Sequence, residues 1–174
     1  MRGSTWLIAA FVAFALPGCQ INPAPSEEIT LHDDAFRPFV EYATGTTRVS
    51  SHLNRFFFKL LARVDRKTGE TSTLVSLVIA YEGSHLRKYK SARNARAEAL
   101  RFYKPTRHRS CEEGWCSFDE TLLIEIPQTE LRQAPPAGYQ LKVFARSGEN
   151  VLITIPRGVI ERLLAKLDNH SPKV

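Results

Sequence analysis

Two neighbouring stretches of this sequence alternate apolar and mixed residues with the period of a β-strand. On one side of residues 56–65 stand Phe56, Phe58, Leu60, Ala62 and Val64. On one side of residues 73–81 stand Val75, Leu77, Ile79 and Tyr81. The residues between the two stretches include Thr68 and Gly69, which are typical of a tight turn. Because a period of two sends alternate side chains to opposite faces of a sheet, the pattern predicts an antiparallel hairpin with one buried face.

Further elements follow from the same test of periodicity. We expect strands, rich in β-favouring residues, at 41–50, 99–107, 118–126, 139–146 and 151–155. The helical period occurs in residues 160–167, with Ile160, Leu163, Leu164 and Leu167 on one side. Residues 91–99 contain four alanines and predict a short helix or an ordered loop, and residues 128–133 predict one helical turn. The expected fold is mostly β, with α+β as the alternative: a single antiparallel sheet or a sandwich-like domain, followed by a C-terminal helix.

Size and composition indicate one globular domain. The chain has 174 residues, of which 43% are hydrophobic and 24% charged. These values are ordinary for a folded protein and exclude collagen, a coiled coil, a polytopic membrane protein and wholesale disorder. We find no internal repeat of the kind that builds solenoids.

The N-terminus has the pattern of a targeting segment. Arg2 precedes an unbroken apolar run at residues 6–16, and Pro17 and Gly18 end that run. A membrane-spanning helix needs about 20 apolar residues. The shorter run is therefore typical of the apolar region of a secretory signal peptide.

The sequence Leu16-Pro17-Gly18-Cys19 resembles the lipobox of bacterial lipoproteins. The resemblance covers residues 1–19 only, and the rest of the chain matches no family that we can define residue by residue. It implies a diacylglycerol on the Cys19 thiol, cleavage before Cys19 and acylation of the new amino terminus, with palmitate as an expected acyl group. Gln20 is not the aspartate that retains such proteins in the inner membrane, so the resemblance favours the outer membrane, with the domain facing the periplasm. Several acyl chains would make a stable anchor.

The expected organisation has three parts. Residues 1–18 form the lipoprotein signal peptide, residues 19–28 the lipidated cysteine and a flexible tether, and residues 29–174 a single β-rich domain. Pro23 and Pro25 within the tether favour an extended stalk.

The two remaining cysteines, Cys111 and Cys116, predict a disulfide. An even pair in an exported protein is typically oxidised, and four intervening residues with one glycine can turn the chain back. A redox-active pair is the first alternative, but the C-x-x-C spacing is missing. A metal site that includes His108 is the second, and it would need reduced thiols. We expect no metal and no cofactor.

Positive charge is concentrated in residues 86–109. This basic run has a net charge of +8, against +6 for the whole chain. Its cations are Arg87, Lys88, Lys90, Arg93, Arg96, Arg101, Lys104, Arg107 and Arg109. Segregated charge of this kind predicts an anionic partner, for which lipid headgroups are the nearest source at a membrane. The alternative is a solvated face whose arginines pair with carboxylates of the same chain. We expect no nucleic acid partner in an exported protein.

No common catalytic motif occurs in the sequence. We therefore expect a non-enzymatic envelope lipoprotein that acts in binding, or as an accessory or assembly factor in contact with an envelope protein. The alternative hypothesis is a binder of anionic lipid or glycan through the basic run. An enzyme of unfamiliar type is the third.

Overall fold

A computed structural model of the chain describes residues 28–51, 54–112 and 115–169. The predicted signal peptide, Cys19 and the tether through residue 27 lie outside the described residues. In the described part, the strands are β1 (Thr30–His32), β2 (Phe39–Ala43), β3 (Thr47–Ser51), β4 (Asn54–Asp65), β5 (Thr71–Gly83), β6 (Tyr89–Asn94), β7 (Ala99–Phe102), β8 (Thr106–Glu112), β9 (Trp115–Glu125), β10 (Tyr139–Ala145) and β11 (Val151–Ile155). The helices are α1 (Gln128–Arg132) and α2 (Arg157–Asp168).

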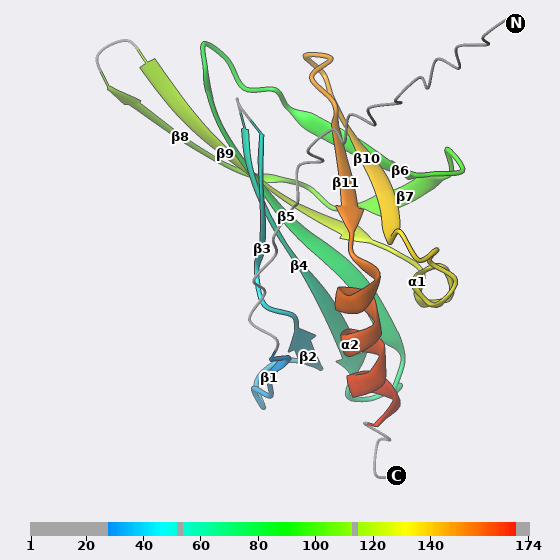
Figure 1. The fold of residues 1–174 in the computed structure, drawn as a ribbon. Helices are drawn as coiled ribbons and strands as arrows, with labels where there is room; N and C mark the ends of the chain where they lie inside the picture. Colours follow the sequence, from blue (N-terminus) through cyan, green and yellow to red (C-terminus); the bar gives the residue numbers. More distant parts are fainter. Residues whose placement is uncertain (1–27, 52–53, 113–114, 170–174) are drawn as a thin grey trace, which may run out of the picture.

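These strands form one antiparallel sheet that curls strongly around its core (Figure 1). The strand order is β1-β2-β4-β5-β9-β7-β6-β10-β11. Two strands lie off this path, because β3 pairs with β4 beyond the end of β2, and β8 pairs with β9 beyond the end of β7. The expected mostly β fold, a single antiparallel sheet with a C-terminal helix, is confirmed.

The hairpin predicted from alternation is β4 and β5, which form the centre of the sheet. Phe58 lies opposite Leu77, and Leu60 opposite Val75, and all four side chains are buried. The same core continues through Leu122 of β9 and its neighbours to β10 and β11.

The predicted C-terminal helix is α2, which packs across the sheet and contacts β4 (Figure 1). It begins directly after Pro156, whose fixed φ suits the entry to a helix. Its buried residues are Val159, Ile160, Leu163, Leu164 and Leu167. No helix in the described ranges is long and apolar enough to cross a membrane.

The structure corrects three of the predicted elements. Residues 91–99 are neither helix nor loop throughout: the first part belongs to β6, in which Tyr89, Ala92 and Asn94 are buried and which pairs with β10 and β7. Pairing on both edges outweighs the helical preference of alanine. The segment 41–50 is two strands, β2 and β3, because Thr44 leaves the ladder and its Oγ1 accepts the N–H of Leu60 at 2.9 Å. The segment 99–107 is also two strands, β7 and β8.

Candidate anion-binding cleft

The sheet divides where β7 ends and β8 begins. β7 pairs with β9 as far as Phe102 opposite Ile124, and β8 pairs with β9 from Thr106 opposite Thr121. Between them lies a short link that contains Pro105, which has no N–H to donate. β6 stays with β7 and β10, while β8 follows β9 into a long hairpin arm (Figure 1). An opening therefore separates the start of β6 from β8.

Glu120 of β9 occupies the base of this opening and is fully buried. Its side chain lies on the same face of β9 as the core residues Phe118 and Leu122. The carboxylate accepts four hydrogen bonds, from Tyr81 Oη at 2.8 Å, Lys88 N at 3.0 Å, Tyr89 N at 3.2 Å and Arg107 Nε at 3.0 Å. Buried backbone N–H groups need acceptors. The Glu120 carboxylate is the acceptor for the N–H groups of Lys88 and Tyr89 at the place where β6 and β8 do not pair.

Tyr81 and Arg87 support this junction from the side of β5. The hydroxyl of Tyr81 accepts the backbone N–H of Arg87 at 2.8 Å. The guanidinium of Arg87 stacks 4.0 Å from the centre of the Tyr81 ring and lies 3.4 Å from the Glu149 carboxylate. Burial raises the pKa of Tyr81, and its hydrogen bond to Glu120 raises it further. Tyr81 and Arg87 are therefore part of a buried framework beneath the opening, together with Glu120.

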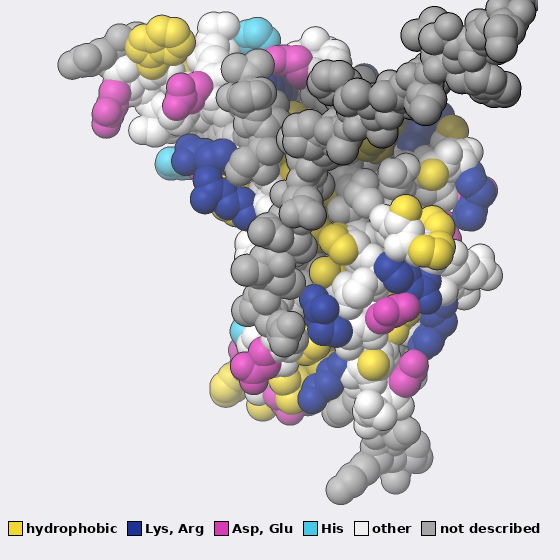
Figure 2. All heavy atoms as spheres, viewed as in Figure 1, with side chains coloured by type: hydrophobic (Ala, Val, Ile, Leu, Met, Phe, Trp, Pro, Cys, Tyr) yellow, Lys and Arg dark blue, Asp and Glu magenta, His cyan; other side chains and the backbone are white. Residues whose placement is uncertain are grey.

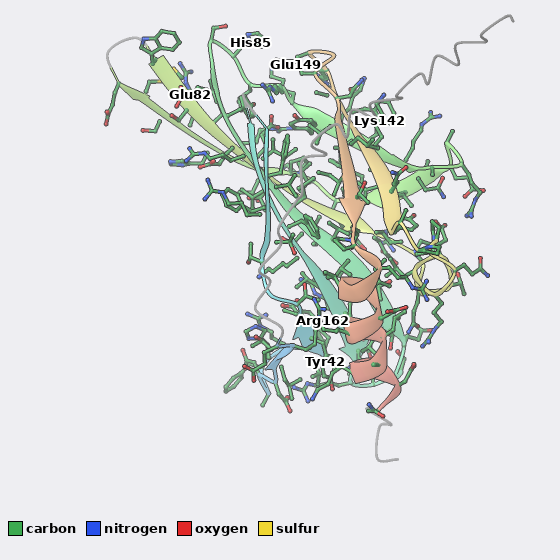
Figure 3. All side chains as sticks on the ribbon, in the orientation of Figure 1. Tyr42, Glu82, His85, Lys142, Glu149 and Arg162 are labelled. Carbon is green, nitrogen blue, oxygen red and sulfur yellow. A yellow bond between two sulfur atoms is a disulfide. The ribbon has the colours of Figure 1, made fainter. Side chains whose placement is uncertain are left out.

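Above this framework lie two adjoining hollows, which together we call the basic cleft. The first, of about 520 Å³, is lined by Lys88, Tyr89, Lys90, Phe102, Lys104, Pro105, Arg107 and Arg146. The second, of about 530 Å³, is lined by Ser84, His85, Leu86, Arg87, Lys88, Arg109, Phe118, Arg146 and Ser147. Lys88 and Arg146 line both hollows. Figure 3 places His85 and Glu149 at the same end of the molecule as the tip of the β8–β9 arm.

Seven lysine and arginine residues line the basic cleft, and none of the described Asp or Glu residues lines it. Arg107 pairs with Glu120 and Arg87 with Glu149. Within the described part of the chain, no ion pair is formed by Lys88, Lys90, Lys104 or Arg146. These four cations are therefore available to an anionic ligand.

Lys88 lies at the centre of the cleft in a strained backbone conformation. Its φ is +59°, in the left-handed region that residues with a Cβ rarely adopt. Two backbone contacts hold it there: its N–H donates to Glu120, and its carbonyl accepts the N–H of Arg146 at 3.2 Å. Strain of this kind is typical of functional positions.

The structure divides the predicted basic run between two environments. Six of the nine cations line the basic cleft, namely Arg87, Lys88, Lys90, Lys104, Arg107 and Arg109. The other three, Arg93, Arg96 and Arg101, lie elsewhere. Arg96 pairs with Glu98 at 2.9 Å and Arg101 with Glu125 at 3.4 Å, while Arg93 donates to the carbonyl of Ala97 at 3.3 Å. The face in Figure 2 shows Lys and Arg side chains in separate groups, several beside Asp or Glu.

Among the lysines and arginines that line the cleft, Arg146 is the one that lies outside the predicted basic run. It lies 37 positions after Arg109 and follows β10, which pairs with β6. A signal was present, because Arg146 ends the predicted strand at 139–146. The pairing of β10 with β6, which brings Arg146 to Lys88, could not be read from the alternation.

The predicted disulfide is present and joins residues directly opposite each other in the β8–β9 arm. The Cα atoms of Cys111 and Cys116 are 4.1 Å apart. Arg109 lies beside it, with Nε 2.9 Å from Sγ of Cys111 and Nη2 3.3 Å from Sγ of Cys116. Arg109, in contact with the disulfide, also lines the second hollow. His108 lies opposite Asp119 on the other face of the arm, so it does not join the two cysteines in a metal site.

A third and smaller hollow lies at the far end of β6. It has a volume of about 230 Å³, and Asn94, Arg96, Glu130 and Tyr139 are among its linings. Glu130 accepts hydrogen bonds from Tyr139 Oη at 2.6 Å and Asn94 Nδ2 at 3.1 Å. Because its polar groups already satisfy one another, this hollow offers less to a ligand than the basic cleft does.

Comparison with family models, curated proteins and solved structures gives no match for this chain. Lysine and arginine side chains in a concave surface bind carboxylate, sulfate and phosphate groups through charge-assisted hydrogen bonds. The arrangement makes the basic cleft a candidate site for an anionic group.

Proposed function

We propose that this chain is a lipid-anchored, non-enzymatic binding protein of the cell envelope. In this proposal Cys19 carries the lipid, the domain faces the periplasm from the outer membrane, and the basic cleft binds the phosphate group of an envelope lipid or glycan. The location is supported by the lipobox-like sequence. The ligand chemistry is supported by the cleft.

The unpaired charge of the cleft is the observation that carries the proposal. Lys88, Lys90, Lys104 and Arg146 converge on one concave surface without a carboxylate partner in the described part of the chain. Like charges that converge in this way repel one another, which destabilises the unliganded protein. A hydrogen bond to a charged group contributes about 1.5–3 kcal/mol. A bound anion therefore relieves the repulsion and gains direct contacts.

The apolar linings of the cleft fit the carbon skeleton that would carry such an anion. Phe102 and Pro105 are partly exposed in the first hollow, and Leu86 is partly exposed in the second. Sites for organic ligands typically combine apolar linings with a few well-placed polar groups. A lipid headgroup or a glycan presents both parts together.

The hypothesis of an accessory factor with a protein partner stays a prediction. The described residue that best suits such a partner is Trp115, which is 73% exposed at the tip of the β8–β9 arm. It lies opposite Glu112, and exposed tryptophans are common at the centre of protein interfaces. This surface faces away from the cleft, because successive residues of β9 alternate in direction.

Vesicle binding tests the proposed function. The processed chain from residue 19 onward, with Cys19→Ser, retains every described residue and receives no lipid. We expect it to sediment with vesicles that contain phosphatidylglycerol but not with pure phosphatidylcholine, and to be released by salt. A soluble phosphorylated sugar, added as competitor, separates the two sources: competition indicates headgroup chemistry in the cleft, whereas retention indicates contact with the bilayer surface. If the protein binds neither the anionic vesicles nor the phosphorylated sugar at low salt, the proposal is contradicted.

A further inference from the structure

We infer that the basic cleft binds a ligand with two separated anionic groups, such as a bisphosphorylated lipid headgroup or glycan, with one group in each hollow. This inference rests on the proposed function and specifies its ligand. It follows from the division of the cleft, from the position of the shared cations and from the balance of charge.

The two hollows lie side by side along β8. Arg107 lines the first hollow and Arg109 the second. They are two residues apart on the same face of one strand, which separates them by about 7 Å. One phosphate cannot occupy both hollows at this spacing.

Lys88 and Arg146 lie where the two hollows adjoin, because both residues line both hollows. The backbone N–H of Arg146 donates to the carbonyl of Lys88 at 3.2 Å, and the N–H of Lys88 donates to Glu120 at 3.0 Å. Both residues are therefore fixed at their backbones, with side chains that line both hollows. Each can contact either anionic group of a ligand that occupies both hollows.

The balance of charge also favours two groups. Of the seven cations in the cleft, Arg107 is offset by Glu120 and Arg87 by Glu149. The other five have no such offset from the residues that the structure describes. A phosphate monoester carries about −1.5 to −2 near pH 7. One phosphate would therefore leave most of this charge uncompensated, whereas two would neutralise about three to four charges.

Calorimetry with soluble sugar phosphates tests the inference on the Cys19→Ser processed chain. The probes are fructose 1,6-bisphosphate, whose phosphates lie at opposite ends of the sugar, and fructose 6-phosphate. Pyrophosphate is the matched control ligand, because its two phosphates share an oxygen and cannot reach both hollows. We expect the bisphosphate to bind at least about tenfold more tightly than either other probe, since its second group binds at high effective concentration.

Variants of the first hollow identify where the groups bind. Lys90 and Lys104 are exposed and line only that hollow. The double variant Lys90→Gln/Lys104→Gln should lose the bisphosphate advantage and keep its affinity for fructose 6-phosphate in the second hollow. The control Lys67→Gln/Lys166→Gln removes the same charge from exposed positions outside the cleft and should bind as the wild type does.

Three results would overturn the inference. Equal affinity for all three probes would show a site for one anion, and would leave the proposed function intact. A bisphosphate advantage that survives Lys90→Gln/Lys104→Gln would show that the two groups do not occupy separate hollows. Failure of both sugars, with continued binding to anionic vesicles, would also overturn it, whereas failure of sugars and vesicles together would overturn the proposed function as well.

Discussion

Arg107 and Glu120 lie opposite each other on β8 and β9, and their ion pair, with 3.0 Å between Nε and the carboxylate, closes the base of the basic cleft. Glu120 is fully buried, whereas the side chain of Arg107 is 34% exposed and reaches the cleft. The pair therefore connects the framework of the fold with the surface that we propose as the binding site.

We expect Glu120→Gln to lower the free energy of unfolding by about 3 kcal/mol, as for other broken buried pairs. Arg107 would lose its partner, and the amide nitrogen would oppose the N–H groups of Lys88 and Tyr89. Denaturation by urea measures the change. The control is Glu70→Gln, at an exposed position in the turn between β4 and β5. A loss no greater than that of the control would contradict the role given to Glu120.

The tyrosines give a prediction about alkaline pH. Burial is the main cause that raises the pKa of Tyr42, Tyr81, Tyr89 and Tyr139. In Tyr103 the main cause is the hydrogen bond to Glu125. Because these folded-state pKa values exceed the value of about 10 in an unfolded chain, the stability they contribute is complete below pH 10 and is lost as the pH rises above it.

Phenolate absorbance should therefore appear together with loss of the β-sheet circular dichroism signal, well above pH 10. A titration that follows both signals on one sample makes the measurement. Phenolate absorbance near pH 10 with an unchanged dichroism signal would contradict the prediction.

The disulfide should form on export and contribute modestly to stability. Alkylation with a mass readout should find no free thiol at Cys111 and Cys116 in protein purified from envelopes, and two in cytosolic protein. Because the closed loop is short, the double variant Cys111→Ser/Cys116→Ser should lose about 2 kcal/mol of unfolding free energy. Two free thiols in the protein purified from envelopes would contradict the prediction that the disulfide forms on export.

The anchor prediction concerns Cys19, which lies outside the described residues. Cys19→Ser should abolish incorporation of labelled lipid and release the processed domain from the membrane fraction. If the variant instead stays in the membrane fraction with residues 6–16 uncleaved, mass spectrometry will detect the retained segment. A wild-type chain that takes up no lipid would show that the resemblance to a lipobox is misleading.

The parts of the fold that periodicity predicts are those in which a single face is buried. The hairpin of β4 and β5 satisfies this condition over most of its length, although Leu61, Leu74 and Ala80 are buried on its other face. The apolar side of α2 satisfies it as well. β6 does not, because it begins at Tyr89, where the carboxylate of Glu120 replaces a neighbouring strand. The four alanines of residues 91–99, of which only Ala92 lies in β6, then give a misleading helical preference.

The site was predictable in part. The concentration of charge in residues 86–109 indicated the region that contributes most cations to the basic cleft, but the sequence does not show which arginines have carboxylate partners. Arg101 meets Glu125 only because β7 pairs with β9. One useful signal was Glu120, which shares the apolar side of β9 with Leu122 and Ile124. A lone carboxylate on a buried face requires several donors, and it marks the junction.

The most direct test of the account compares two triple variants with equal loss of charge. Lys90→Gln/Lys104→Gln/Arg146→Gln removes cations from the basic cleft, and Arg93→Gln/Arg96→Gln/Arg101→Gln removes them from the rest of the basic run. Each cation near an anionic surface contributes about 1 kcal/mol. The cleft variant should therefore lose at least about tenfold in affinity for phosphatidylglycerol vesicles, while the other variant binds nearly as the wild type does. Equal losses in both variants, with unchanged melting temperatures, would show that binding follows net charge and not the cleft.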